Sequence, residues 1–231
     1  MNPAGRSLWR PSPSAPPLAA EELHLWRFPL DPSSHDLPLL QKLLSSDELQ
    51  RAARLLDPRK AQAFSVSRAR LRQILASYLA VAPAQIEFCY GPHGKPALQA
   101  PVATSLTFNL THSGAWALLV VARGREVGVD LEKIDPCLDY ERLAARFLTP
   151  EENAALTAAP EGRRRRKFYR LWTGKEARLK GEGGGFSASD LHLSASWFTR
   201  NFWLAPGYVG SVACAVAIVS IQRFSMGCDR K

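Results

Sequence analysis

Gly128-Val129-Asp130-Leu131-Glu132 is a short stretch in which apolar and acidic residues alternate. Side chains two residues apart point to the same face of an extended strand, so Val129 and Leu131 face one side and both carboxylates face the other. Gly128 lies on the acidic face and leaves room there for a close approach. A lone Asp-x-Glu pattern is most often a solvated strand face, so this stretch needs a chemical partner before it indicates a site.

A third acid lies on the helix that we expect from Phe168 to Lys180. At about 100° per residue, Glu176 falls at the edge of the apolar face of this helix. A carboxylate there is costly unless it is paired or binds a metal. A simple ion pair with Lys180, four residues further on, is one alternative. The other is Mg²⁺, which prefers oxygen ligands and keeps places for waters and phosphates.

The composition indicates a globular protein with an anionic partner. Of the 231 residues, 46% are apolar, and 30 basic against 21 acidic residues give a formal charge of +9. This excess favours nucleic acid, a membrane surface, a phosphorylated cofactor or an acidic protein. The four cysteines are scattered and suit reduced thiols, and the longest apolar run, Val209 to Ile221, is shorter than the about 20 residues that span a bilayer. We expect a soluble cytoplasmic protein.

Local patterns predict a mixture of helices and strands. Residues 1–20 are rich in proline and serine and are expected to be a disordered tail. A strand is expected at Leu23–Phe28, a helix after the capping box that begins at Ser45, a second helix at 60–79, and a strand buried on both faces at 115–122. Thr149 and Pro150 predict another helix start. We expect an N-terminal subdomain at 21–123, a C-terminal subdomain at 124–222 and a short tail at 223–231.

Two loops carry groups that can bind phosphate. Phe108 to Gly114 contains an amide, an imidazole and two hydroxyl groups just before the buried strand, and Gly114 allows close backbone approach. Gly91 to Pro96 holds one lysine between residues that form turns. Each loop alone is weak evidence.

Taken in order, these motifs resemble those of the 4'-phosphopantetheinyl transferases. The matching segments are Gly94-Lys95-Pro96, Phe108 to Gly114, Gly128 to Glu132, and Trp172 to Lys180. The resemblance covers about 23–219 and is closest to the larger, surfactin-synthetase-activating (Sfp-like) class. It implies an α+β fold of two similar α/β subdomains related by a pseudo-two-fold axis, with coenzyme A in the cleft between them.

The resemblance also implies an activity and a set of site residues. The family transfers the 4'-phosphopantetheine arm of coenzyme A to a serine of an apo acyl or peptidyl carrier protein and releases 3',5'-ADP. Asp130, Glu132 and Glu176 would bind Mg²⁺; Glu176 would also be the base, and Lys180 would stabilise the breaking pyrophosphate. The residues expected to contact coenzyme A are Arg68 (preferred over Arg59 for the 3'-phosphate), Gly94, Lys95, Pro96, Thr111, His112, Ser113 and Lys180.

Two departures from the family pattern are mild. Thr111 stands where serine is common and keeps the hydroxyl group, whereas Arg178 stands where an aromatic residue is usual and affects local packing. We expect a monomeric transferase that binds neither nucleic acid nor membrane. The alternatives are a nucleic-acid-binding protein, suggested by the basic run Arg163 to Lys167, and an inactive scaffold. We interpret the basic run instead as a surface that recruits an acidic carrier protein.

Overall fold

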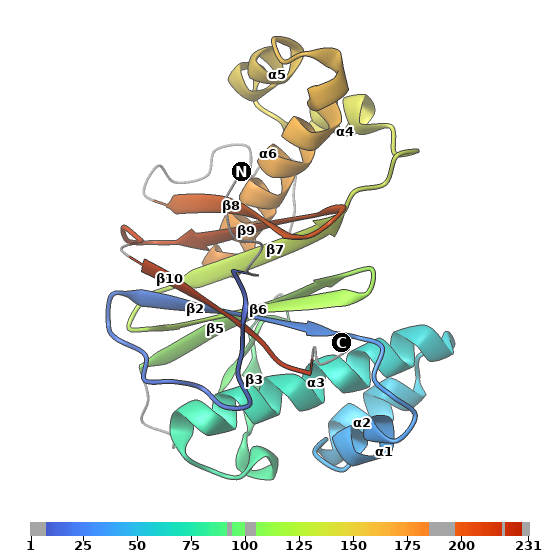
Figure 1. Ribbon diagram of the computed structural model, residues 1–231, viewed down its shortest axis with the longest axis vertical. Coiled ribbons are helices and arrows are strands. Elements are labelled where there is room, and N and C mark those ends of the chain that lie inside the picture. Colours follow the sequence, from blue (N-terminus) through green and yellow to red (C-terminus); the bar gives the residue numbers. More distant parts are fainter. Residues whose placement is uncertain (1–7, 92–93, 100–104, 185–196, 219, 228–231) are drawn as a thin grey trace.

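The computed structural model describes residues 8–91, 94–99, 105–184, 197–218 and 220–227. Helices cover the outer faces of two β-sheets that pack against each other (Figure 1). One apolar core lies beneath helix α3, a second lies between the sheets, and a third lies under helices α4 to α6. The predicted α+β fold class is confirmed.

The larger sheet contains the strand that is buried on both faces. Its strand order is β1 (Arg10–Pro11), β10 (Ser220–Ser225), β2 (Glu22–Pro29), β6 (Trp116–Arg123) and β5 (Leu106–Ser113). Leu119 of β6 packs toward α3, whereas Leu118 packs toward the other sheet, and neither is exposed to solvent. The strand predicted at 115–122 is therefore confirmed.

The helices of the first half begin where the sequence predicts caps. They are α1 (Asp36–Gln41), α2 (Ser46–Ala53) and α3 (Pro58–Leu79), with a 3-10 turn, η1, at Pro83–Gln85. The Ser45 N–H donates to Glu48 Oε2 at 3.0 Å, which confirms the capping box. Helix α3 starts two residues earlier than expected because Asp57 accepts a hydrogen bond from the Arg59 N–H at 2.9 Å and Pro58 stands at its first position.

The smaller sheet carries the acidic stretch. Its order is β7 (Val127–Lys133), β9 (Tyr208–Cys214) and β8 (Phe198–Ala205), and the helices beside it are α4 (Tyr140–Phe147), α5 (Pro150–Thr157) and α6 (Glu161–Glu182). Thr149 caps α5 as predicted. Helix α6 begins seven residues before the expected Phe168, so Arg163 to Lys167 are helical.

Helix α6 lies directly against the backbone of β7. A Cβ on Gly128 would lie 1.9 Å from the Ala177 carbonyl oxygen and 2.4 Å from the Gly181 nitrogen. The space that Gly128 leaves is thus filled by α6. The alternation of β7 is confirmed, because Val127, Val129 and Leu131 all lie in the core between the sheets.

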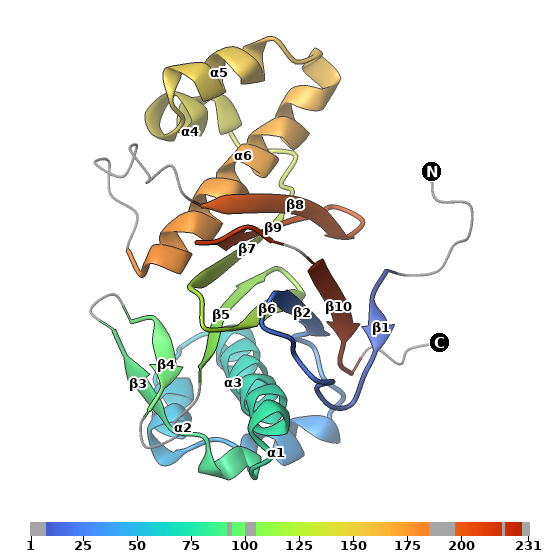
Figure 2. The same ribbon diagram turned by 90° about the vertical axis from the view of Figure 1, so that its left-hand side faces the viewer.

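The chain ends differ from the expected tails. Trp9 is 5% exposed and packs against the Phe202 ring, and Leu18 is also buried, so residues 8–20 are held by apolar contacts. β10 pairs with β2 in parallel, which returns the C-terminal segment to the larger sheet, and Phe224 is buried there. Figure 2 shows β1 and β10 side by side. The subdomain boundaries at 21, 124 and 223 stay a prediction. Both ends of the described chain, β1 and β10, join the larger sheet.

Within the described residues, no helix combines the length and the apolar character that crossing a bilayer requires.

The contact at Gly128 generates a stability prediction. Gly128→Ala should lower the free energy of unfolding by about 1–3 kcal/mol or more, because the added methyl group meets backbone that cannot rotate away. Thermal unfolding should shift down by about 2–4 °C per kcal/mol for a chain of this size. Gly162→Ala is the matched control, since a Cβ there has nothing within 4 Å. A Gly128→Ala protein that melts with the wild type would contradict the direct packing of α6 on β7.

Candidate active site

Asp130 and Lys180 form the centre of the site, where β7 meets α6. The Asp130 side chain is buried, and Lys180 Nζ lies 2.5 Å from Asp130 Oδ1. Lys180 Nζ also donates to Thr111 Oγ1 at 3.2 Å, which links α6 to β5 of the other sheet. The alternative of a simple Glu176–Lys180 pair is not what the structure shows, because the salt bridge of Lys180 is with Asp130.

The second carboxylate oxygen of Asp130, Oδ2, is not hydrogen-bonded within the described chain. This oxygen is buried. An unpartnered carboxylate oxygen away from water is costly, so it requires a water, an ion or a ligand group. A hard cation with oxygen ligands fits this atom.

Glu132 faces the same side of β7 as Asp130. The Ser113 hydroxyl donates to Glu132 Oε2 at 3.0 Å and accepts from the Lys133 N–H, also at 3.0 Å. Burial raises the pKa of Glu132, and the negative charge of Asp130 raises it further. The two carboxylates are therefore close enough to repel each other.

Glu176 brings the third carboxylate from α6. Burial raises the pKa of Glu176; the Lys180 charge opposes this effect, and the charges of Asp130 and Glu132 add to it. Within the described residues, no group of three or more His, Cys, Asp or Glu side chains is already close enough to hold a metal alone. An ion here would need further oxygens, as Mg²⁺ commonly takes from waters and substrate phosphates.

The predicted phosphate-binding segment is divided between the two faces of β5. Thr111 and Ser113 face β7, where Thr111 Oγ1 lies 3.4 Å from Asp130 Oδ1. His112 is exposed on the opposite face, the one that carries the buried Phe108. Although part of the ring surface is exposed, surrounding protein atoms partly desolvate the imidazole; this desolvation and then the Lys180 charge lower the pKa of His112, which favours the neutral ring.

The hairpin of β3 (Phe88–Tyr90) and β4 (Pro96–Leu98) reaches the end of α6 (Figure 2). Gly94 has a φ of 76°, which a turn residue without a Cβ adopts readily. Lys95 Nζ donates to the Gly181 carbonyl oxygen at 2.8 Å and lies 3.3 Å from Glu126. Lys95 therefore contacts the last turn of α6, at the residue next to Lys180. Pro92 and His93 lie outside the described residues.

Arg68 is buried in a network of charges. Arg68 Nε donates to Glu48 Oε1 at 2.7 Å, and Arg72 Nε donates to Glu48 Oε2 at the same distance. Arg68 Nη2 donates to the Tyr90 hydroxyl at 3.0 Å, and its guanidinium lies over the Phe88 ring. Arg68 thus contacts the same hairpin as Lys95, while Arg59 is exposed at the start of α3.

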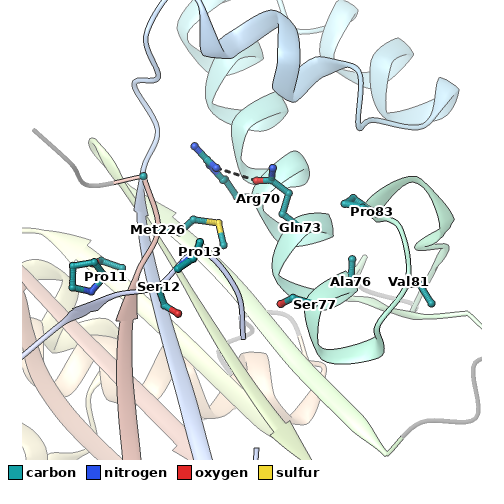
Figure 3. A pocket seen from close by; sticks show the side chains of 12 residues that line it. Pro11, Ser12, Pro13, Arg70, Gln73, Ala76, Ser77, Val81, Pro83 and Met226 are labelled. Carbon is teal, nitrogen blue, oxygen red and sulfur yellow. Dashed lines mark hydrogen bonds between the residues drawn. The ribbon is translucent and has the colours of Figure 1, made fainter. Parts of the chain in front are cut away.

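A cavity of about 620 Å³ lies elsewhere, between α3 and the end of β10 (Figure 3). Arg70 and Gln73 point into it and are joined by a hydrogen bond of 3.0 Å. Its lining contains none of the predicted site residues.

Sequence reasoning missed one polar residue of the site. The sequence pattern predicts the Asn109 amide as one of several groups that can bind phosphate, and it predicts no contact of this amide with the backbone. Its Oδ1 accepts a hydrogen bond from the Val129 N–H at 2.9 Å, next to Asp130. The available signal was its spacing, since Asn109 shares a strand face with Thr111 and Ser113.

Two family models match most of this chain. Residues 126–203 match the 4'-phosphopantetheinyl transferase superfamily, and residues 29–123 match the family described as 4'-phosphopantetheinyl transferase, N-terminal. Among individual proteins, 4'-phosphopantetheinyl transferase HetI of Nostoc sp. is 44% identical over 180 residues, which are 78% of this chain and 76% of HetI.

Two further relatives are more distant. A putative 4'-phosphopantetheinyl transferase of Synechocystis sp. is 40% identical over 71% of this chain and 65% of its own length. A 4'-phosphopantetheinyl transferase of Bacillus subtilis is 30% identical over 62% of each chain. With identity of this level over most of the sequence, the chain belongs to the 4'-phosphopantetheinyl transferase superfamily.

Proposed function

We propose that this protein transfers the 4'-phosphopantetheine group of coenzyme A to a serine of an apo acyl or peptidyl carrier protein. The observation that carries the proposal is the group of three acids beside Lys180, in which Asp130 Oδ2 lacks a partner among the described residues. The reaction leaves 3',5'-ADP. The match of residues 29–123 favours the larger, Sfp-like class.

Mg²⁺ is the metal that this donor set fits best. Asp130, Glu132 and Glu176 would hold it, and the unpartnered Oδ2 of Asp130 would be one of its ligands. When bound, the ion would neutralise charge on the pyrophosphate. Lys180 offsets only part of the repulsion among the three acids, so a bound metal ion would be stabilised by the remaining negative charge.

Lys180 would bind the pyrophosphate. In the structure its ammonium group already lies beside Asp130 and Thr111. We expect it to turn toward a phosphate oxygen when coenzyme A enters, where it would stabilise charge on the departing 3',5'-ADP. Thr111, Ser113 and the neutral His112 would add hydrogen bonds to coenzyme A phosphates.

Glu176 would be the general base, directly or through a water. Its raised pKa makes it a stronger proton acceptor than an ordinary glutamate. Glu176 would take the proton of the carrier serine as the serine oxygen bonds to the β-phosphorus, and the bond from that phosphorus to the bridging oxygen of the pyrophosphate would break. Gly94, Lys95, Pro96 and Arg68 would lie against the adenine and the 3'-phosphate, with coenzyme A in a cleft between the two halves.

A basic groove on α6 is our candidate for recruiting the carrier. A groove of about 490 Å³ lies between α6 and β8. Four basic side chains and one aromatic ring line it: Arg163, Arg166, Lys167, Arg170 and Trp203. Trp203 is 50% exposed and lies under the Arg166 guanidinium. An acidic, partly apolar surface complements this groove.

The groove and the acids lie on opposite sides of α6. Thr173 of α6 lies over β9, where its hydroxyl is 2.6 Å from Ser211 Oγ. Ser211 pairs with Asp130 on one side and with Asn201 on the other, and Asn201 contacts the Arg170 carbonyl oxygen. The groove would therefore hold the carrier without touching the reacting atoms. We also propose that the protein is a cytoplasmic monomer that binds no nucleic acid.

The transfer itself is tested by intact mass. With Mg²⁺ and coenzyme A, an apo carrier protein should gain the mass of one phosphopantetheine group, and Asp130→Ala or Glu176→Ala should lower the rate by about 100-fold or more. Addition of a chelator should stop the reaction, and excess Mg²⁺ should restore it. No gain across a panel of carriers, or full activity in both variants, would reject the proposal and leave the inactive scaffold.

Removing one acid should separate stability from activity. Because the pKa of Glu176 is raised above its ordinary 4.5, its ionised form destabilises the metal-free fold at neutral pH. Glu176→Gln should therefore raise the melting temperature in chelator by about 1–4 °C while transfer is lost. The gain should disappear as the pH falls below 4.5, where the carboxyl group is protonated in both the folded and unfolded states.

Glu21→Gln, at an exposed position, is the control and should leave both stability and activity unchanged. A Glu176→Gln protein that melts lower than the wild type at neutral pH would show that Glu176 stabilises the metal-free fold.

Charge reversal tests the basic groove. Arg166→Glu combined with Arg170→Glu should raise the KM for the carrier by about tenfold, which is ~1.4 kcal/mol, with kcat and the KM for coenzyme A unchanged. The control is Lys42→Glu combined with Arg54→Glu, at exposed positions of the other half. This variant has the same net charge as the groove variant and should leave the KM for the carrier nearly unchanged. Unchanged carrier KM together with loss of tight, salt-sensitive DNA binding would favour the nucleic-acid alternative.

A further inference from the structure

One face of β5 carries polar side chains at every second position, and each of them contacts β7 or the turn before it. These residues are Thr107, Asn109, Thr111 and Ser113. We propose that Asn109 is a positioning residue of the site: it fixes the register of β7 against β5 and thereby the placement of the acids. This inference rests on the proposed function but names a residue that touches neither substrate nor metal.

The contact of Asn109 is buried and specific. Its side chain is 5% exposed, and its Oδ1 accepts the hydrogen bond of the Val129 N–H at 2.9 Å. Val129 is itself fully buried in the core between the sheets, so water cannot easily replace this acceptor. A buried backbone donor without an acceptor costs free energy, so loss of the Asn109 acceptor would favour a shifted position of β7.

The contact lies on the edge of β7 that β9 does not use. β9 pairs with β7 along one edge, with Val129 opposite Val212 and Asp130 opposite Ser211. Backbone N–H groups alternate between the two edges of a strand, so the N–H groups of Val129 and Lys133 point to the same edge. Asn109 accepts from the first and Ser113 from the second, at 2.9 and 3.0 Å.

The matching spacing sets the register. Val129 and Lys133 are four residues apart, as are Asn109 and Ser113, so both bonds form together in only one alignment of the strands. This alignment puts Asp130 beside Thr111 and Glu132 beside Ser113. Side chains of β5 thus replace a neighbouring strand for β7, and they hold the acids in reach of Lys180.

The alternative is that Asn109 only stabilises the fold. Thr107 provides the matched comparison, because its Oγ1 donates to the Arg125 carbonyl oxygen at 2.6 Å on the same face of β5. Thr107→Val removes one hydrogen bond, from β5 to the turn before β7, and its partner Arg125 lies five residues before Asp130 in the sequence. A purely structural role predicts similar behaviour for the two positions, whereas a positioning role predicts a defect in metal binding at Asn109 alone.

The test measures metal binding without requiring turnover. Asn109→Leu keeps the shape and removes the acceptor, Asn109→Asp keeps the acceptor, and Asn109→Ser is used if the leucine variant does not fold by circular dichroism. Each protein is titrated with MnCl₂ in the presence of coenzyme A, with bound Mn²⁺ followed by electron paramagnetic resonance. Transfer to an apo carrier is assayed in parallel at saturating metal.

Asn109→Leu should weaken Mn²⁺ binding by about tenfold or more and lower kcat, with the KM for the carrier within about twofold of wild type. Asn109→Asp should bind Mn²⁺ more tightly than Asn109→Leu, and Thr107→Val should match the wild type in Mn²⁺ affinity. Asn109→Leu with wild-type Mn²⁺ affinity, or with the same defect as Thr107→Val, would overturn the inference. If the wild type binds Mn²⁺ with coenzyme A but modifies no carrier, the proposed function fails, while the Mn²⁺ titrations still decide the role of Asn109.

Discussion

The close contact between α6 and β7 at Gly128 is the constraint on which the site depends. A side chain at Gly128 would overlap the Ala177 carbonyl oxygen, and Gly181 faces this point from the helix. Because the helix lies on the strand backbone, Glu176 and Lys180 come within electrostatic reach of Asp130 and Glu132. The acids that are about 45 residues apart in the sequence become one group through a contact between glycines.

The three acids Asp130, Glu132 and Glu176 destabilise the metal-free fold and at the same time favour the binding of a cation. Glu132 and Glu176 are both harder to ionise than ordinary glutamates, since they are buried and near like charges. Lys180, Thr111 and Ser113 satisfy part of this charge, but Asp130 Oδ2 has no partner within the described chain. A cation and a phosphate would supply what is missing, which is the arrangement expected where a fold is preorganised for charge in the transition state.

The sequence predicted those helix starts and strands that depend on residues close together in the chain. Three features could be predicted because each depends on neighbouring residues: the alternation of β7, the capping boxes at Ser45 and Thr149, and the burial of β6 on both faces. Contacts between segments far apart in the sequence could not be predicted. The return of β10 to the larger sheet, the burial of Trp9 and the pairing of Lys180 with Asp130 depend on contacts between segments far apart in sequence. The contact of Asn109 could not be predicted because its partner is a backbone group, which leaves no pattern of side chains.

The most direct measurement is a crystal structure with Mn²⁺ and coenzyme A, in which anomalous scattering locates the metal. The account predicts an anomalous peak beside Asp130 Oδ2, held by Asp130, Glu132 and Glu176, with Lys180 Nζ turned from Asp130 to a phosphate oxygen. The Val129 N–H should still donate to Asn109. A metal bound away from Asp130, or a Lys180 that keeps its bond to Asp130 while the pyrophosphate lies elsewhere, would contradict it.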